Sequence, residues 1–189
     1  RINGSELRCK VVGEGGNLGM TQLGRIEYAL RGGRLNTDFI DNSGGVDCSD
    51  HEVNMKILLN RAVAMGDLTG KQRNIMLEDM TDDVATLVLK NNYRQTQAIS
   101  IASDDTATRL EEFRRLMNTM ESEGKLNREL EFLPNDETLA ERKMAKTGLT
   151  RPELSVLISY VKGDLKQTLI DSSLPDNPLL AGEMYKVFP

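Results

Sequence analysis

The spacing of apolar residues changes along the chain near residue 66. Before it, short apolar runs alternate with glycine-rich turns, whereas after it apolar residues recur every three or four positions. The runs at residues 7–12 and 35–40 each lead into a glycine turn, which predicts two buried strands. Residues 23–30 have the apolar spacing of a helix, and the glycine pair that follows is expected to end it.

The helical pattern also predicts which face of each later helix is buried. A long helix after residue 45 has an apolar side made by Val53, Ile57, Leu58, Ala62 and Met65. One further stripe is expected to pack inside a helical domain, although it also fits a short coiled coil; it consists of Leu110, Phe113, Met117 and Met120. The most regular apolar face consists of Leu154, Leu157, Ile158, Val161, Leu165 and Leu169.

Polar residues mark the beginnings of three of these helices. Thr69 with Gln72, and Thr150 with Glu153, have the spacing of a capping box, in which each side chain bonds the backbone of the other residue. Asn135 is expected to cap a third helix. Together these patterns predict an α/β, helix-dominated fold with two parts: a Rossmann-like parallel sheet edge at residues 1–66 and an all-α region at residues 67–189.

Composition narrows the class of protein. The 189 residues are 39% hydrophobic and 28% charged, an ordinary balance for a soluble globular protein. A formal net charge of -5 argues against non-specific nucleic-acid binding, and no apolar run approaches the roughly 20 residues of a membrane-spanning helix. Two cysteines without CxxC spacing fit a reducing cytoplasm. The chain begins with Arg1 and no signal peptide is visible. Because the initiator Met is missing, we expect an excerpt of a longer chain or a processed product.

The first glycine turn, residues 13–19, lies where an α/β sheet binds a dinucleotide. It matches the first two glycines of G-x-G-x-x-G, but Leu18 stands at the third, while Asp38 lies at about the right distance for a ribose-binding acid. Consecutive glycines still let a ligand approach the backbone. The amide of Asn17 suits a ribose hydroxyl or a carboxamide, and it equally suits a residue that merely tolerates a tight turn.

A second turn repeats this arrangement, because Asn42 leads into Gly44 and Gly45. Turns after two strands of one sheet would face the same crevice. Val46 and Ser49 then share one face in the first turns of the following helix. An apolar surface beside a hydroxyl at a helix N-terminus suits a small carboxylate, whereas Ser49 also fits a solvent-facing helix serine.

These two turns resemble sequence motifs of glutamate dehydrogenases. Residues 14–17 are similar to the EGAN segment of that family, and residues 42–49 are similar to its N-x-GGV-x-x-S segment, with a matching Glu52. The sequence beyond these motifs resembles the large bacterial NAD-specific glutamate dehydrogenases essentially from end to end. The longest similar stretches are residues 15–22, 36–54 and 148–154, and the similarity reaches the closing Tyr185, Phe188 and Pro189.

The resemblance implies oxidative deamination of L-glutamate to 2-oxoglutarate and ammonia, with hydride transfer from the substrate Cα to NAD. Asn17 would contact the nicotinamide ribose side of the cofactor, and Asn42 would lie beside the nicotinamide. Val46 and Ser49 would line the pocket for the substrate side-chain carboxylate. The implied cofactor-binding residues are Gly15, Gly16, Asn17, Asn42, Gly44 and Gly45.

The resemblance also implies that part of the site lies elsewhere. The catalytic lysine, the proton-transferring aspartate and the phosphate-binding turn of the family belong to segments upstream, so no catalytic residue is expected here and the chain alone is expected to be inactive. Residues 1–66 would then be the second half of the NAD-binding domain, followed by a helical C-terminal domain. The expected partners are glutamate and 2-oxoglutarate, the rest of its own chain and further copies in a homo-oligomer, with neither nucleic acid nor membrane.

The sequence gives less support for a metal site or for a function other than catalysis. Cys48, Asp50, His51 and Glu52 occupy nearly consecutive helix positions, whose side chains diverge, so we expect no metal site. His51 is expected at a helix surface or a domain contact. The alternative function is a helical interaction or assembly module whose glycine turns are only structural; the enzyme hypothesis instead requires Asn17, Asn42 and Ser49 to line one concave surface.

Overall fold

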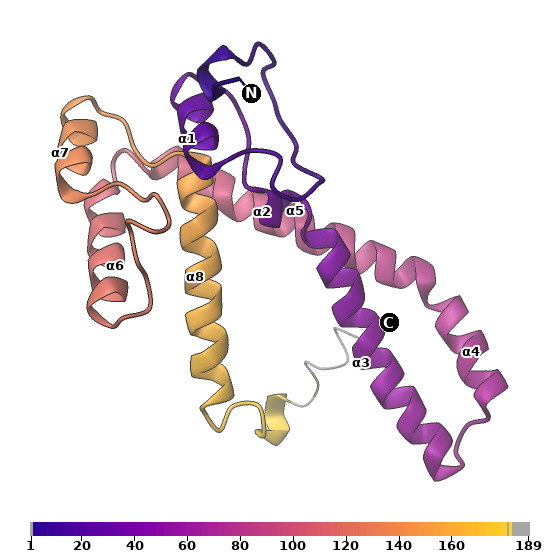
Figure 1. Ribbon diagram of the computed structural model, residues 1–189. Helices are drawn as coiled ribbons and strands as arrows, with labels where there is room; N and C mark the ends of the chain where they lie inside the picture. The colour runs from indigo at the N-terminus through magenta and orange to yellow at the C-terminus, as the bar shows by residue number, and fades with distance from the viewer. Residues whose placement is uncertain (1, 181, 183–189) are drawn as a thin grey trace. The chain divides into compact units, whose positions relative to one another are not determined.

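The computed structural model describes residues 2–180 and 182, and the described chain is built of helices (Figure 1). The elements in chain order are η1 (Gly4–Glu6), α1 (Gln22–Leu30), α2 (Asp38–Asp41), α3 (Ser43–Met65), α4 (Gly70–Asp79), α5 (Thr81–Asp105), α6 (Leu110–Ser122), α7 (Asp136–Met144) and α8 (Arg151–Ile170). They form two compact units. Of the described residues, unit 1 contains 2–42 and 95–168, and unit 2 contains 43–94 and those from 169 onward.

The described residues form no β-sheet, so the predicted Rossmann-like sheet edge at residues 1–66 is wrong. The two predicted strands do meet, but only at one parallel bridge between Val11 and Arg34. Its two backbone hydrogen bonds run from the Val12 N–H to the Arg34 carbonyl, 2.9 Å, and from the Arg34 N–H to the Lys10 carbonyl, 3.0 Å. A parallel sheet needs several strands with covered faces, and two short extended segments do not supply them.

The second predicted strand and its glycine turn are largely helical. Thr37 precedes the short helix α2, and a single residue, Asn42, separates α2 from α3. The apolar run at 35–40 reflects burial instead, because Leu35 and Ile40 are both buried. A short buried run does not by itself distinguish strand from helix. Gly44 therefore lies inside the first turn of α3, not in a loop.

The prediction for α1 is confirmed. Thr21 caps the helix, accepting a hydrogen bond from the Gly24 N–H at 3.1 Å. The two glycines that follow have different roles, because Gly32 ends the helix and Gly33 permits close packing. Gly32 adopts a φ of 88°, which favours glycine, while a Cβ on Gly33 would overlap the ring of buried Tyr28 at 2.3 Å.

The apolar face predicted for the long helix α3 is wrong. Its buried residues are His51, Met55 and Leu59. Of the two places expected for His51, the helix surface is therefore wrong, and the domain contact stays a prediction. The exposed side carries Val53, Ile57, Leu58 and Met65. Positions four apart give two competing apolar stripes on this helix, and packing decides between them. Within unit 2, α3 contacts α4, and Asp47 of α3 accepts a hydrogen bond from Asn91 of α5 at 3.0 Å.

The core of unit 1 confirms the stripe predicted on α6. Leu110, Met117 and Met120 are buried there, with Phe113 packed against them, and α6 lies beside α7 (Figure 1). The last helix follows its prediction only in its first half, since Leu154 and Leu157 are buried. The second half exposes Val161, Leu165 and Leu169.

Helix caps are largely as predicted. Thr69 and Gln72 form both bonds of the capping box. Asn135 accepts the Thr138 N–H at 2.8 Å. Before α8, Glu153 accepts the Thr150 N–H at 2.6 Å, the carboxylate half of the predicted box. None of the helices in residues 2–180 is long and apolar enough to cross a membrane.

The unit 1 core predicts the effect of truncating Met117, which is fully buried. Met117→Ala leaves a cavity and should lower the free energy of unfolding by about 2–5 kcal/mol. Urea denaturation followed by circular dichroism measures this. Met144→Ala, at an exposed methionine, is the matched control, and an equal loss in both variants would contradict the assigned core.

Candidate functional site

The two asparagines predicted at the cofactor lie together in unit 1. Asn42 donates a hydrogen bond from its Nδ2 to the Oδ1 of Asn17, over 2.8 Å. Asn17 is exposed in the glycine turn, and Asn42 is partly buried at the C-terminal end of α2. Two positions separated by 25 residues in the chain thus form one amide pair.

The glycine turn beside this pair is open. A Cβ added to Gly13, Gly15 or Gly16 would meet nothing within 4 Å. At the position where the fingerprint has its third glycine, Leu18 adopts a φ of 57°, in the left-handed region. That conformation costs a leucine roughly 1–2 kcal/mol. The turn therefore needs interactions that hold it in place.

Three carboxylates supply those interactions by accepting backbone N–H groups of the turn. Asp38 accepts the Leu18 N–H at 2.8 Å, and Glu14 accepts the Met20 N–H at 3.3 Å. Asp41 accepts the Glu14 N–H at 3.0 Å. These bonds satisfy backbone donors in a segment that forms no helix or strand of its own.

Arg25 of α1 binds two of these carboxylates at once. It is bidentate to Glu14, with Nε and Nη2 at 2.6 and 2.7 Å, and its Nη2 also lies 3.0 Å from Asp38. The side chains of Arg25 and Glu14 are only 6% and 4% exposed. A paired, hydrogen-bonded geometry of this kind is what makes buried charge tolerable.

Each charge in this cluster stabilises its partner. The hydrogen bond to Glu14 raises the pKa of Arg25, against the opposing effect of burial. Burial alone would raise the pKa of Asp38, but the Leu18 N–H and the charge of Arg25 outweigh it and lower that pKa. Both groups therefore stay charged at neutral pH.

The remaining predicted residues lie on α3, in unit 2. A Cβ on Gly44 would come within 3.3 Å of the Asn92 amide and 3.6 Å of Val88, so this glycine permits close packing of α3 on α5. Val46 is exposed, and the Ser49 hydroxyl donates to the Gly45 carbonyl at 3.1 Å. The shared surface for Ser49 and the two asparagines stays a prediction, because these residues belong to different units.

Sequence reasoning missed Arg25 as part of this site. The helix was identified from its apolar residues, yet Arg25 is buried while Leu23 and Leu30 of the same helix are exposed. A signal was available, because Glu14 lies in the turn, Asp38 lies in the second motif, and two carboxylates held near each other both stay ionised only beside a cation. Asp38 was considered only as a ribose ligand, and it is engaged by Arg25 and the Leu18 N–H.

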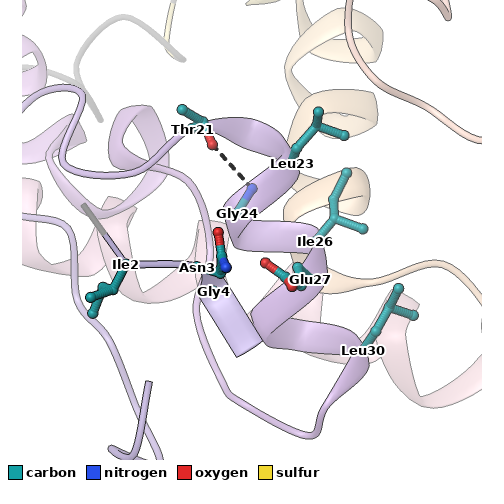
Figure 2. A pocket seen from close by; sticks show the side chains of 9 residues that line it. All are labelled: Ile2, Asn3, Gly4, Thr21, Leu23, Gly24, Ile26, Glu27 and Leu30. Carbon is teal, nitrogen blue, oxygen red and sulfur yellow. Dashed lines mark hydrogen bonds between the residues drawn. The ribbon is translucent and has the colours of Figure 1, made fainter. Parts of the chain in front are cut away.

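A separate pocket of about 490 Å³ lies between η1 and α1 (Figure 2). Apolar side chains, among them Ile2, Leu23 and Leu30, contribute to its lining, together with Glu27. The predicted cofactor and substrate residues do not line it, so it gives no support to those assignments. Within the described chain, no group of three or more His, Cys, Asp or Glu side chains is placed to hold a metal ion.

Two family descriptions match the chain that carries this open glycine turn and amide pair. "Bacterial NAD-glutamate dehydrogenase, catalytic domain" covers residues 1–102, and "Glutamate dehydrogenase, C-terminal" covers residues 146–189. The chain belongs to the bacterial NAD-glutamate dehydrogenase family. This confirms the resemblance seen in the sequence.

Similar proteins are also named as glutamate dehydrogenases. The chain is 62% identical to an "NAD-specific glutamate dehydrogenase" of Pseudomonas aeruginosa, 57% to one of Halomonas elongata and 45% to one of Mycobacterium tuberculosis. Each similarity covers all 189 residues of the chain. The chain spans only 12% of the length of these relatives.

The buried cluster predicts that Arg25→Met is strongly destabilising. Glu14 and Asp38 would remain buried without their cation, which should lower the free energy of unfolding by about 3 kcal/mol. Chemical denaturation at neutral pH measures the loss. Arg109→Met removes an exposed ion pair with Glu112 and should change little; similar losses in both variants would refute the role given to the cluster.

The lowered pKa of Asp38 predicts an acid-sensitive stability. In the unfolded chain Asp38 binds its proton near its ordinary pKa of 3.8, while in the folded chain it does so only at lower pH. Its contribution is therefore present above about pH 4 and is lost as the pH falls through the folded pKa. Unfolding free energies measured across this range should fall less steeply for Asp38→Asn than for the parent chain. Parallel curves would argue against the assigned contacts.

Proposed function

We propose that this chain is part of an NAD-dependent glutamate dehydrogenase of amino-acid catabolism and binds the nicotinamide end of the cofactor. The observation that carries the proposal is the hydrogen bond between Asn17 and Asn42 beside an open glycine turn. The names of the similar proteins support the reaction, oxidative deamination of L-glutamate to 2-oxoglutarate and ammonia. The two free cysteines, Cys9 and Cys48, support a cytoplasmic location.

The amide pair has the hydrogen-bonding groups that a nicotinamide carboxamide requires. Once Asn42 has donated to Asn17, the pair still offers the Nδ2 hydrogens of Asn17 and the Oδ1 of Asn42. A carboxamide presents one carbonyl acceptor and one NH₂ donor, which complement these groups. The exposed glycines beside the pair leave space for the cofactor to approach the backbone. NAD held by these residues would supply the hydride acceptor for oxidation at the substrate Cα.

For the substrate, we assign Val46 and Ser49 to the side-chain carboxylate. Ser49 has a hydroxyl that donates to Gly45 in the structure and needs only a χ1 rotation to donate to a carboxylate instead. Val46 adds an exposed apolar surface one helical turn away. These residues bind and orient glutamate, while the proton-transferring groups lie outside this chain.

A kinetic dissection in the full-length dehydrogenase tests both assignments. Asn17→Ala should raise KM for NAD by about tenfold, the worth of one good hydrogen bond, and leave KM for glutamate nearly unchanged. Ser49→Ala should raise KM for glutamate and leave KM for NAD nearly unchanged. Asn127→Ala is the matched control, because Asn127 is also an exposed turn asparagine and lies outside the proposed site. An unchanged KM for NAD in Asn17→Ala, or equal effects of Ser49→Ala on both substrates, would overturn the assignments.

A further inference from the structure

The beginning of α8 is hydrogen-bonded to the segment that carries the amide pair. Arg151, the first residue of α8, donates from Nε to the Oδ1 of Asn36 and from Nη1 to the hydroxyl of Ser100, both at 3.0 Å. Gln22 of α1 donates to the Pro152 carbonyl at 3.2 Å. All of these residues belong to unit 1. The helix that begins the matched C-terminal segment thus contacts the matched catalytic-domain segment.

From Arg151 the hydrogen bonds continue to the glycine turn. Asn36 is buried and donates from Nδ2 to one oxygen of Asp41 at 2.8 Å. The other oxygen of Asp41 accepts the Glu14 N–H at 3.0 Å. Arg151 thus fixes the amide of Asn36, and this amide sets the orientation of the Asp41 carboxylate.

Asp41 occupies a key position for both asparagines. It directly precedes Asn42 in the chain, and it holds the N–H of Glu14, three residues before Asn17. A rotation of this carboxylate would move the base of the turn relative to the end of α2. The 2.8 Å bond between the two amides would lengthen as a result.

Arg151 is an unusual choice for a purely structural contact. Within the described residues its guanidinium forms no salt bridge, and its assigned partners are the neutral oxygens of Asn36 and Ser100. Burial lowers its pKa, while the nearby charge of Asp41 acts in the opposite direction. An apolar residue would fill this place at lower electrostatic cost, so the directional hydrogen bonds are the property that only arginine provides.

We propose that Arg151 is a positioning residue for NAD binding, acting through Asn36 and Asp41 on the Asn17–Asn42 pair. The inference rests on the proposed function. It assigns the C-terminal segment of the chain a role in cofactor recognition, exerted over a chain of hydrogen bonds and without contact to the cofactor.

The test is steady-state kinetics of Arg151→Met in the full-length dehydrogenase. KM for NAD should rise between about twofold and about thirtyfold, the range typical of residues that act through intermediates, while KM for glutamate changes little. Asn36→Ala should raise KM for NAD similarly. The double variant should raise KM for NAD no further than Asn36→Ala alone. Both changes break the same relay, the hydrogen bonds that lead from Arg151 through Asn36 to Asp41.

Arg142→Met is the matched control. Arg142 also fastens the first turn of α8, through a bidentate bond to buried Glu153 at 2.7 and 2.8 Å, but it does not contact Asn36. This variant should lower the melting temperature and leave KM for NAD unchanged. If Arg142→Met raises KM for NAD as much as Arg151→Met, or if Arg151→Met lowers only the melting temperature, the relay is refuted.

Two further variants distinguish a misfolded protein, a wrong relay and a wrong proposed function. Where Arg151→Met does not fold, Arg151→Lys is measured instead, and it should likewise raise KM for NAD and leave KM for glutamate nearly unchanged. Lysine keeps the positive charge but cannot make both hydrogen bonds with the geometry of a guanidinium. Asn17→Ala is measured in parallel. An effect of Asn17→Ala on KM for NAD without an effect at Arg151 refutes the relay alone, whereas no effect of Asn17→Ala refutes the proposed function.

Discussion

The guanidinium of Arg25 donates three hydrogen bonds to the carboxylates of Glu14 and Asp38, and each carboxylate also accepts a backbone N–H of the glycine turn. The turn contains open glycines and a leucine in the left-handed region, so it has little local preference for one conformation. Its shape is imposed by buried charges, that of Glu14 within the turn and those of Arg25 and Asp38 outside it. The positions of Asn17 and Asn42 depend on this arrangement.

Sequence reasoning succeeded where a structure is decided locally. The bonds of Thr69 and Asn135 involve residues three positions away, and each follows from side-chain chemistry alone. The end of α1 follows from the same kind of local rule. The motifs that carry Asn17 and Asn42 were recognisable because they are long and continuous, and the family assignment they implied is confirmed.

The wrong or missing predictions have one cause: whether a residue is buried depends on residues far from it in the sequence. The run at 35–40 is apolar because Leu35 and Ile40 are buried, and neither its length nor its composition reveals that a helix begins within it. On α3, the side with Met55 was chosen over the side with Val53 by packing that the pattern does not contain. Arg25 was missed for the same reason, since its partners lie 11 and 13 residues away. The boundary at residue 66 stays a prediction, although unit 1 contains residues from both sides of it.

The bond between Arg151 and Asn36 spans 115 residues of chain, and this has a consequence for biosynthesis. A ribosome adding about 5–20 residues per second needs roughly 6–23 seconds to cover that distance. During this interval the nascent glycine turn lacks its connection to α8, and much of the core of unit 1 has not yet been made. Folding of the glycine turn and its amide pair is therefore completed late, because α8 is synthesised after every other element of unit 1.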